Sequence, residues 1–510
     1  MSIVLFPNYN WFTFRITYYN GAALRPRDWS GLGEYHAGSE INMSTISKLS
    51  IVLGFLCAAG PAYAAPMVAI ASLSGPIAVT AQSGEPYRGT NEQPVAGPGL
   101  PIPALVPYGY VEEEYFVSGT VDGRAYKTSL LVRKPKDLRK FSGLVALETV
   151  HAQGAIPFWG QREVWLKGGH GWVAVGSQLV ALEQYIRKSN PERYASLTIP
   201  EAAPAATAQG GNPLAGGAQS RISQQILTQV GALLKSNAKS GPFAGMKVKY
   251  LLMGGSSQTG GTTLQYIQES HAQARMPDGK PIYDGYAPME AFAHGPISGG
   301  DAAVMHVVGE GDFELFRAMT QGGDYGIRED NDAPNDRFRE YQIVASSHVP
   351  TRGLSDPRVL IPTLDKGAGA GEHLSQFPSA PIYKAAMTHL VDWVMKGVAP
   401  PKAARIEMLN GEFLRDEFGN AKGGIRSPYV DVPIAHYIAS APDPDGKNRV
   451  RRMLGLQEPF SEEKLKSLYK TRENYLQLFD QGIDKMVAGG WLLAEDAPKL
   501  KEDEARIPAF

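Results

Sequence analysis

The chain has 510 residues, of which 43% are hydrophobic, and its formal net charge is −1. A chain of this length and composition can bury a substantial core, so we expect a globular protein. The balanced charge argues against nucleic acid as a partner. We therefore expect no nucleic acid partner, and the sequence leaves the oligomeric state open.

The first part of the chain has the features of a secretory leader. After Met43 come Lys48, an apolar run over residues 49–59 and an Ala-Tyr-Ala cleavage site at residues 62–64. This pattern predicts a signal peptide at residues 43–64, a mature chain that is periplasmic or secreted, and a non-native upstream extension at residues 1–42. The apolar run is too short to span a bilayer, so no stable membrane anchor is expected after cleavage.

The single cysteine, Cys57, lies inside this leader. The mature chain would then contain no disulfide, no thiol nucleophile and no cysteine metal ligand. The histidines are scattered, and none pairs at the helical spacing of metal ligands with a carboxylate between. We therefore expect neither a metal nor another cofactor.

The order of elements in the mature chain predicts an α/β fold. Residues 65–107 are rich in Pro, Gly, Ser and Ala and are expected to form an N-terminal arm; a hairpin follows around Asp122-Gly123. Short apolar strands then alternate with helical patterns, which indicates a mostly parallel sheet covered on both faces. The predicted core is residues 108–400, with a flexible insertion at residues 201–220 and a C-terminal extension, residues 401–510, packed on the core.

The most informative stretch is residues 247–265, KVKYLLMGGSSQTGGTTLQ, which combines a buried strand, a glycine-rich turn and a helix start. This is the layout of a nucleophile elbow, in which small residues must flank the serine. Ser257 is flanked by Gly255 and Thr259, whereas the competing Ser256 has the bulky Gln258 two positions later. We therefore predict Ser257 as the nucleophile. The backbone N–H of Gln258 would stabilise an oxyanion at the helix start.

Two later strand ends carry the partners that a serine nucleophile needs. The apolar stretch 302–308 leads to Glu310 and Asp312, and the stretch 341–345 leads to His348. A histidine accepts the serine proton when a carboxylate fixes its tautomer and stabilises the resulting cation. The order Ser, acid, His predicts a triad of Ser257, Asp312 and His348, with Glu310 as the alternative acid.

Several motifs resemble those of the secreted bacterial α/β-hydrolase domain-containing proteins, a serine-hydrolase-like family. Residues 255–260 fit its G-x-S-Q-[ST]-G elbow, and residues 171–178 fit its G-x-x-V-x-V-x-x-Q strand. Residues 335–339 and the loop at 419–433 are also similar to the family. The resemblance spans about residues 110–505 and implies an α/β-hydrolase fold with a serine ester hydrolase-like site. The E-x-[DE] acid turn leaves Glu310 and Asp312 open.

The remaining site predictions concern loops. A backbone N–H near Ala152, in the loop after the third strand of the hydrolase core, is the expected second oxyanion donor. His151 and Trp159 are candidates to contact substrate; Arg426 is expected to pin the C-terminal extension through Asp431 or to bind a substrate carboxylate. We expect hydrolysis of a carboxylic ester or lactone through an acyl-enzyme. The alternatives are acyl transfer by the same triad and a non-catalytic exported binding protein.

Overall fold

A computed structural model of the chain describes residues 68–80, 82–91, 104–202, 218–293, 295–320, 325–350, 352, 373–441 and 452–507. The predicted upstream extension and signal peptide, and residues 203–217 of the predicted insertion, lie outside the described residues. Within the described part, no helix is both long enough and apolar enough to cross a membrane.

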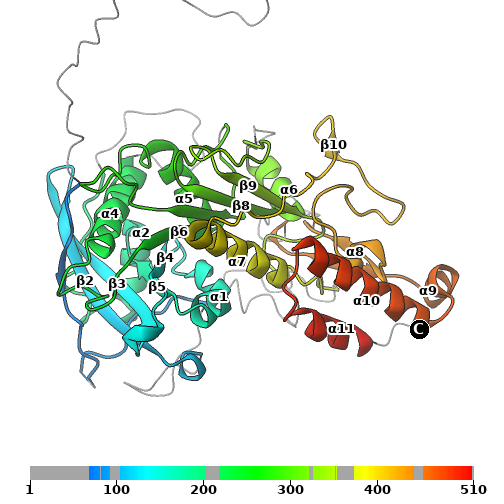
Figure 1. The fold of residues 1–510 in the computed structure, drawn as a ribbon, viewed down its shortest axis with the longest axis horizontal. Helices are drawn as coiled ribbons and strands as arrows, with labels where there is room; N and C mark the ends of the chain where they lie inside the picture. The colour runs from blue at the N-terminus through cyan, green and yellow to red at the C-terminus, as the bar shows by residue number, and fades with distance from the viewer. Residues whose placement is uncertain are drawn as a thin grey trace, which may run out of the picture. The chain divides into compact units, whose positions relative to one another are not determined.

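The centre of the fold is a nine-stranded sheet with the strand order β1-β2-β3-β5-β4-β6-β7-β8-β9 (Figure 1). β1, β2, β3 and β5 pair antiparallel in that order, whereas every pairing from β5 to β9 is parallel. The strands are β1 (Ser72–Ser74), β2 (Tyr110–Val121), β3 (Arg124–Pro135), β4 (Leu144–Thr149), β5 (Gly171–Val175), β6 (Tyr250–Ser256), β7 (Gly285–Met289), β8 (Ala303–Gly309) and β9 (Phe338–Ile343).

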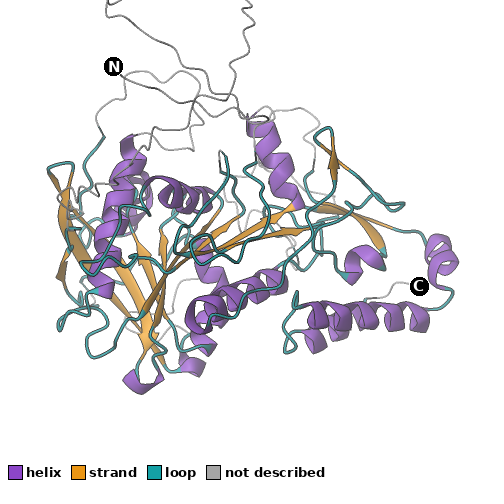
Figure 2. Ribbon diagram, turned by 45° about the horizontal axis from the view of Figure 1, so that its top comes forward, coloured by secondary structure: helices purple, strands orange, loops and turns teal. Residues whose placement is uncertain are grey.

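Helices cover both faces of this sheet (Figure 2). One face carries α4 (Ala218–Lys235) and α5 (Gln258–Glu269), and the other carries α1 (Arg162–Lys167) and α7 (Ala380–Lys396). All residues of β4, β5, β7, β8 and β9 are buried, as expected for parallel strands enclosed on both sides. The structure therefore confirms the predicted mostly parallel α/β architecture.

The chain up to β9 contains further helices. They are η1 (Val106–Tyr108), η2 (Leu138–Lys140), η3 (Pro157–Gln161), the continuous run of α2 (Leu179–Ala181), η4 (Leu182–Ile186) and α3 (Arg187–Ser189), and α6 (Glu310–Thr320). α6 starts directly at the end of β8, so its first turn lies at the carboxyl edge of the sheet, where the parallel strands end.

Two strands of the nine-stranded sheet were not predicted. β7 has the sequence GYAPM, whose Gly285 and Pro288 argue against a central strand because they weaken the strand and remove one hydrogen-bond donor. Burial between β6 and β8 overrides this local preference. β1 belongs to the predicted N-terminal arm, and it pairs with β2, so the arm adds an edge strand to the sheet.

The C-terminal region consists of small elements that adjoin the end of β9. Val344 N–H donates to the Ile425 carbonyl at 3.1 Å, and Val349 N–H donates to the Met453 carbonyl at 2.8 Å. The chain around His348 is thus held on both sides by the extension. Its elements are β10 (Met408–Leu409), β11 (Glu412–Phe413), α8 (Pro428–Asp431), β12 (Ala435–Ile438), β13 (Leu456–Pro459), α9 (Glu462–Tyr469), α10 (Arg472–Gly489) and α11 (Ala497–Ala505).

Candidate active site

Ser257 occupies a sharp turn between β6 and α5. Its backbone has φ 57° and ψ −123°, a strained conformation for a residue with a side chain. The neighbouring glycines make this turn possible: a Cβ on Gly255 would lie 2.5 Å from the Thr259 carbonyl, and one on Gly260 would lie 2.2 Å from the Met289 carbonyl oxygen. The glycine pattern in the sequence therefore reflects close backbone contacts that fix the serine at the carboxyl edge of the sheet.

His348 joins Ser257 to Asp312. Its Nε2 lies 2.9 Å from the Ser257 hydroxyl oxygen, and its Nδ1 lies 2.6 Å from Oδ1 of Asp312. The second carboxylate oxygen of Asp312 accepts a hydrogen bond from the Gly309 backbone N–H at 2.6 Å. The acid is therefore fixed at the end of β8, and it orients the imidazole toward the serine.

Burial distinguishes the three side chains. Asp312 and His348 are 3% and 6% exposed, whereas Ser257 is partly exposed. Burial lowers the pKa of His348, but the hydrogen bond to Asp312 and the charges of Asp312 and Glu290 outweigh this effect and raise it above 6.5. The arrangement thus favours proton uptake by the imidazole beside an accessible hydroxyl.

The adjacent Ser256 has a different partner. Its hydroxyl donates to Oε2 of Glu290, the residue that follows β7. Sequence reasoning did not identify Glu290, because it did not identify β7. The available signal was an acid directly after a strand, but that signal becomes visible only when GYAPM is recognised as a strand.

Glu310, the alternative acid, does not bond to His348. One of its carboxylate oxygens accepts from the Ala345 N–H at 2.9 Å, and the other pairs with Arg415 at 3.0 Å. Ala345 has φ 63°, so Glu310 stabilises the tight turn that leads to His348. Although both acids belong to the first turn of α6, the structure directs only Asp312 to the imidazole.

The two predicted oxyanion donors are placed differently. Gln258 is the first residue of α5, so its backbone N–H belongs to the helix end that attracts anions. The Ala152 N–H lies in the expected loop, but it donates to the side-chain oxygen of Gln258 at 3.1 Å. Gln258 and Gln178 also exchange amide hydrogen bonds of 2.8 and 3.0 Å. In this structure, therefore, the predicted role of Ala152 is blocked by a glutamine side chain.

The three predicted substrate contacts also differ in placement. Burial, and to a smaller extent the charge of the nearby His348, lowers the pKa of His151 to about 4. Trp159 is only 3% exposed, and its ring packs on Trp172 and on the Arg133 guanidinium. This placement gives Trp159 a structural position in the core in place of the predicted one in a substrate pocket.

Arg426 is bound within the C-terminal extension. It donates to Asp431 at 2.6 Å, to Asp416 at 2.7 Å and to the Ala421 carbonyl oxygen. All three partners belong to the extension itself, so these contacts stabilise it internally and do not attach it to the active-site face, and they occupy the guanidinium that was the alternative candidate for a substrate carboxylate.

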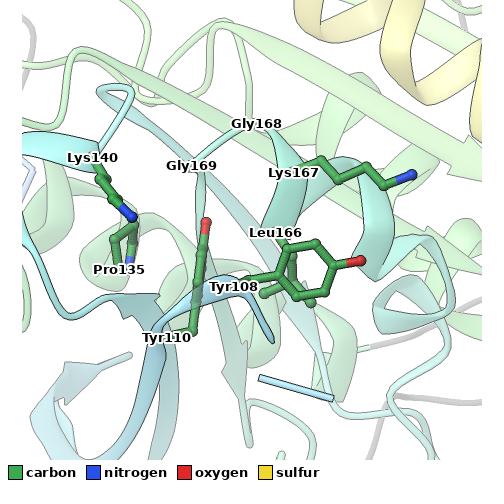
Figure 3. Close-up of a pocket in the computed structure, with 8 residues that line it drawn as sticks. All are labelled: Tyr108, Tyr110, Pro135, Lys140, Leu166, Lys167, Gly168 and Gly169. Atoms are coloured by element: carbon green, nitrogen blue, oxygen red, sulfur yellow. The ribbon is translucent and has the colours of Figure 1, made fainter. Parts of the chain in front are cut away.

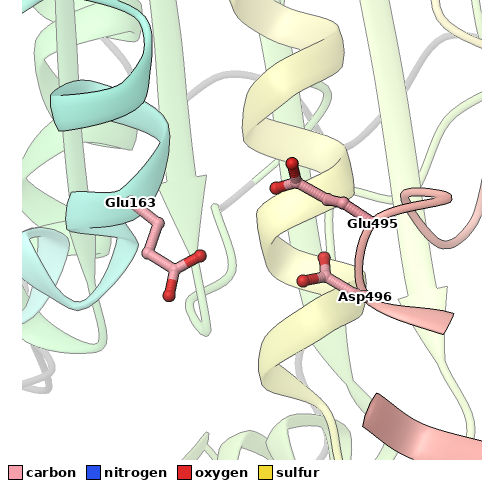
Figure 4. Close-up of side chains that lie close together, drawn as sticks. All are labelled: Glu163, Glu495 and Asp496. Carbon is pink, nitrogen blue, oxygen red and sulfur yellow. The ribbon is translucent and has the colours of Figure 1, made fainter. Parts of the chain in front are cut away.

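A group of carboxylates lies apart from the serine site. Among the described residues, Glu163, Glu495 and Asp496 form the one cluster with the proximity of metal ligands (Figure 4). The ammonium group of Lys384 lies 2.8 Å from a carboxylate oxygen of each of them. A lysine at this position supplies the positive charge that a cation would bring, so the cluster fits an ionic contact between α1, α7 and the C-terminal segment.

A cavity of about 500 Å³ (Figure 3) has none of Ser257, Asp312 and His348 among its lining residues. Its lining includes Tyr108, Lys140 and Gly169. Because Gly169 lies two residues before the start of β5, this cavity adjoins the amino end of a parallel strand. Ser257, Asp312 and His348 all follow the carboxyl ends of their strands.

Comparison with known proteins identifies a family. The family described as "Alpha/beta hydrolase domain" matches residues 73–502. No curated protein matches the chain.

Three hydrolases are among the solved structures to which the chain shows similarity. Esterase Est22 has 14% identity and TM-score 0.23, with 41% of this chain and 49% of Est22 covered. A promiscuous CE15 esterase from a marine bacterial metagenome has 9% identity and TM-score 0.25, with 40% of this chain and 64% of that esterase covered. Dienelactone hydrolase from Anabaena variabilis has 14% identity and TM-score 0.25, with 49% of this chain and 93% of that hydrolase covered. The chain spans about half the length of Est22.

Proposed function

The chain belongs to the α/β-hydrolase domain family, and from this premise we propose that it is a serine hydrolase acting on a carboxylic ester or lactone. The observation that carries the proposal is the continuous contact from Asp312 through His348 to Ser257, with distances of 2.6 and 2.9 Å. Each group has the residue type and the atom-to-atom contact that acyl transfer through an acyl-enzyme requires.

In the proposed first step, Ser257 Oγ attacks the substrate carbonyl carbon while His348 Nε2 takes the hydroxyl proton. The Asp312 carboxylate accepts from Nδ1–H and stabilises the imidazolium that forms. The carbonyl oxygen becomes an oxyanion, which the Gln258 N–H and the amino end of α5 stabilise. Collapse of this intermediate breaks the bond to the leaving alcohol, which receives the proton from His348, and leaves an acyl group on Ser257.

In the second step, His348 takes a proton from a water molecule, and the resulting hydroxide attacks the acyl carbon. The acid product leaves, and Ser257 regains its proton from His348. A lactone follows the same steps, except that its leaving alcohol remains part of the product.

The proposal is tested by covalent labelling with a fluorophosphonate and by hydrolysis of short-chain activated esters. We expect both activities in the mature chain from Ala65, and we expect Ser257→Ala to remove both. A folded wild-type protein that neither reacts with the probe nor cleaves the esters would contradict the proposal. Product analysis in the presence of an added alcohol separates hydrolysis from acyl transfer.

We further propose export of the chain, on the basis of the signal-peptide pattern at residues 43–64. Amino-terminal sequencing of protein isolated from its natural source tests this. A terminus near Ala65 is the expected result, and a mature protein that begins at Met1 would contradict it.

A further inference from the structure

We propose that Glu290 is a positioning residue of this site, which holds Ser256 and the Ser257 turn and places a second negative charge beside His348. The inference rests on the proposed function, in which His348 is the base. It deepens that function by assigning a role to a carboxyl group outside the Ser257, His348 and Asp312 contact.

The first support is the position of Glu290 in the backbone. It follows β7, the strand that pairs with β6, and its own φ is 54°. The preceding residue, Met289, accepts a hydrogen bond of 3.0 Å from the backbone N–H of Ser257. A non-glycine residue is held in this strained conformation only where the surroundings enforce it, and here the strained residue adjoins the serine turn.

The second support is the hydrogen bond between the two side chains. Ser256 directs its hydroxyl to Oε2 of Glu290, and Ser256 is only 8% exposed. The end of β7 therefore contacts the elbow twice, through the Glu290 carboxylate on Ser256 and through the carbonyl of the preceding Met289 on Ser257. A shift of Glu290 would move the hydroxyl of Ser257 relative to Nε2 of His348.

The third support is the set of charged and titratable groups around the carboxyl. Asp312 of α6, His348 after β9 and Tyr383 of α7 all interact with it, and His306 of β8 bonds the adjoining Ala291 carbonyl at 2.7 Å. Burial and the charge of Asp312 raise the pKa of Glu290 to about 7, while His348 and the hydroxyls of Ser256 and Tyr383 oppose this rise.

The consequence for His348 has a definite sign. The charge of Glu290 raises the pKa of His348, in the same direction as Asp312. A negative charge beside the imidazole favours the imidazolium that forms when Ser257 attacks. When Glu290 binds a proton, this second contribution is lost, so the two groups titrate as a linked pair.

The test compares Glu290→Gln with a matched control, Glu504→Gln. The Glu290→Gln substitution keeps an oxygen that accepts from Ser256 but removes the charge. Glu504 of α11 is also a buried carboxyl, its pKa is raised by burial, and it accepts from the Tyr475 hydroxyl. Two measurements are made on each protein: the pH dependence of fluorophosphonate labelling, and the NMR titration of His348, assigned with His348→Gln.

We expect Glu290→Gln to lower the pKa of His348, to move the acid limb of labelling to lower pH and to slow labelling three- to tenfold at the optimum. Glu504→Gln should match the wild type. If Glu290→Gln had the same His348 pKa and the same pH dependence of labelling as the wild type, the proposal would be overturned, because loss of a purely structural role would change neither. The NMR titration needs no turnover, so it tests the charge effect even in a protein that fails the esterase assay.

Ser256→Ala is the second variant, in case Glu290→Gln does not fold. Removal of this hydroxyl removes a hydrogen bond that favours the ionised carboxyl, so the pKa of Glu290 should rise and that of His348 should fall. The expected shift has the same sign as in Glu290→Gln and is smaller. An unchanged His348 titration in Ser256→Ala would contradict the proposal.

Discussion

Ser256 and Ser257 are adjacent in the chain, but their hydroxyl groups bond to different partners, Glu290 for the first and His348 for the second. We therefore expect Ser257→Ala to reduce ester hydrolysis by on the order of 10⁴-fold or more, because it removes the nucleophile. Ser256→Ala should keep the labelling site and react more slowly. Mass spectrometry of the labelled peptide identifies the modified serine, and a label on Ser256 in the wild type would contradict the assignment.

The two acids of α6 should also differ in effect. Asp312→Asn leaves the shape unchanged but no longer stabilises the required tautomer of His348, and a loss of about 10⁴-fold in kcat is expected. Glu310→Gln leaves the Asp312 contact intact and should reduce kcat less than tenfold, with a lower melting temperature because the pairing with Arg415 is weakened. An equal loss of kcat in both folded variants would show that the roles are not separated in this way.

The pH dependence of kcat/KM should reflect the raised pKa of His348. The free enzyme needs a neutral imidazole to accept the serine proton, so activity should fall as the pH decreases through a midpoint above 6.5. The linked stability has the opposite trend: the paired imidazolium stabilises the folded state fully below the unfolded pKa, and this contribution is lost as the pH rises through the folded pKa. Circular dichroism across the same range separates loss of base from unfolding, and an acid-limb midpoint well below 6.5 would contradict the prediction.

Lys384 should be important for stability rather than for catalysis. Its ammonium group is mostly enclosed by Glu163, Glu495 and Asp496, and Lys384→Met would leave three carboxylates without that counterion. We expect a lower melting temperature, with part of the loss restored by high salt, because salt screens the remaining repulsion. Lys167→Met is the control, since Lys167 bonds two of these acids from an exposed position and should have a smaller effect.

The sequence was most informative at positions where both the reaction chemistry and the backbone geometry restrict which residue type can occur. Gly255 and Gly260 identify the Ser257 turn because a Cβ at either position would meet backbone atoms. The order of strand ends brings Asp312 and His348 to the same edge. The choice between Glu310 and Asp312 needed coordinates. The two lie in one helical turn, and only their side-chain directions distinguish them.

Other features escaped sequence reasoning because tertiary contacts decide them. Pro288 argues against a strand at this position, so the sequence did not predict β7 or the functional position of Glu290 directly after it. Local patterns also cannot show that the Gln258 side chain occupies the Ala152 N–H, or that Trp159 packs on Arg133 in the core. Each of these contacts joins residues that lie on different elements of the fold.

Gly260 and Gly261 are neighbours in α5 that differ in their surroundings. Alanine at residue 260 would place its Cβ 2.2 Å from the Met289 carbonyl oxygen, whereas at residue 261 it would meet no atom within 4 Å. Gly260→Ala must move α5 away from β7, at a cost of about 1–3 kcal/mol, and because the same carbonyl accepts from the Ser257 N–H, labelling should fall more than tenfold.

Gly261→Ala should instead stabilise the protein by up to about 1 kcal/mol, since alanine restricts the unfolded chain and favours the helix. Chemical unfolding and labelling rates measured on both variants separate the two effects. If both substitutions changed stability and labelling alike, helix propensity rather than the contact with Met289 would govern this turn. Opposite changes would show that the close approach of α5 to β7 sets the position of the Ser257 hydroxyl.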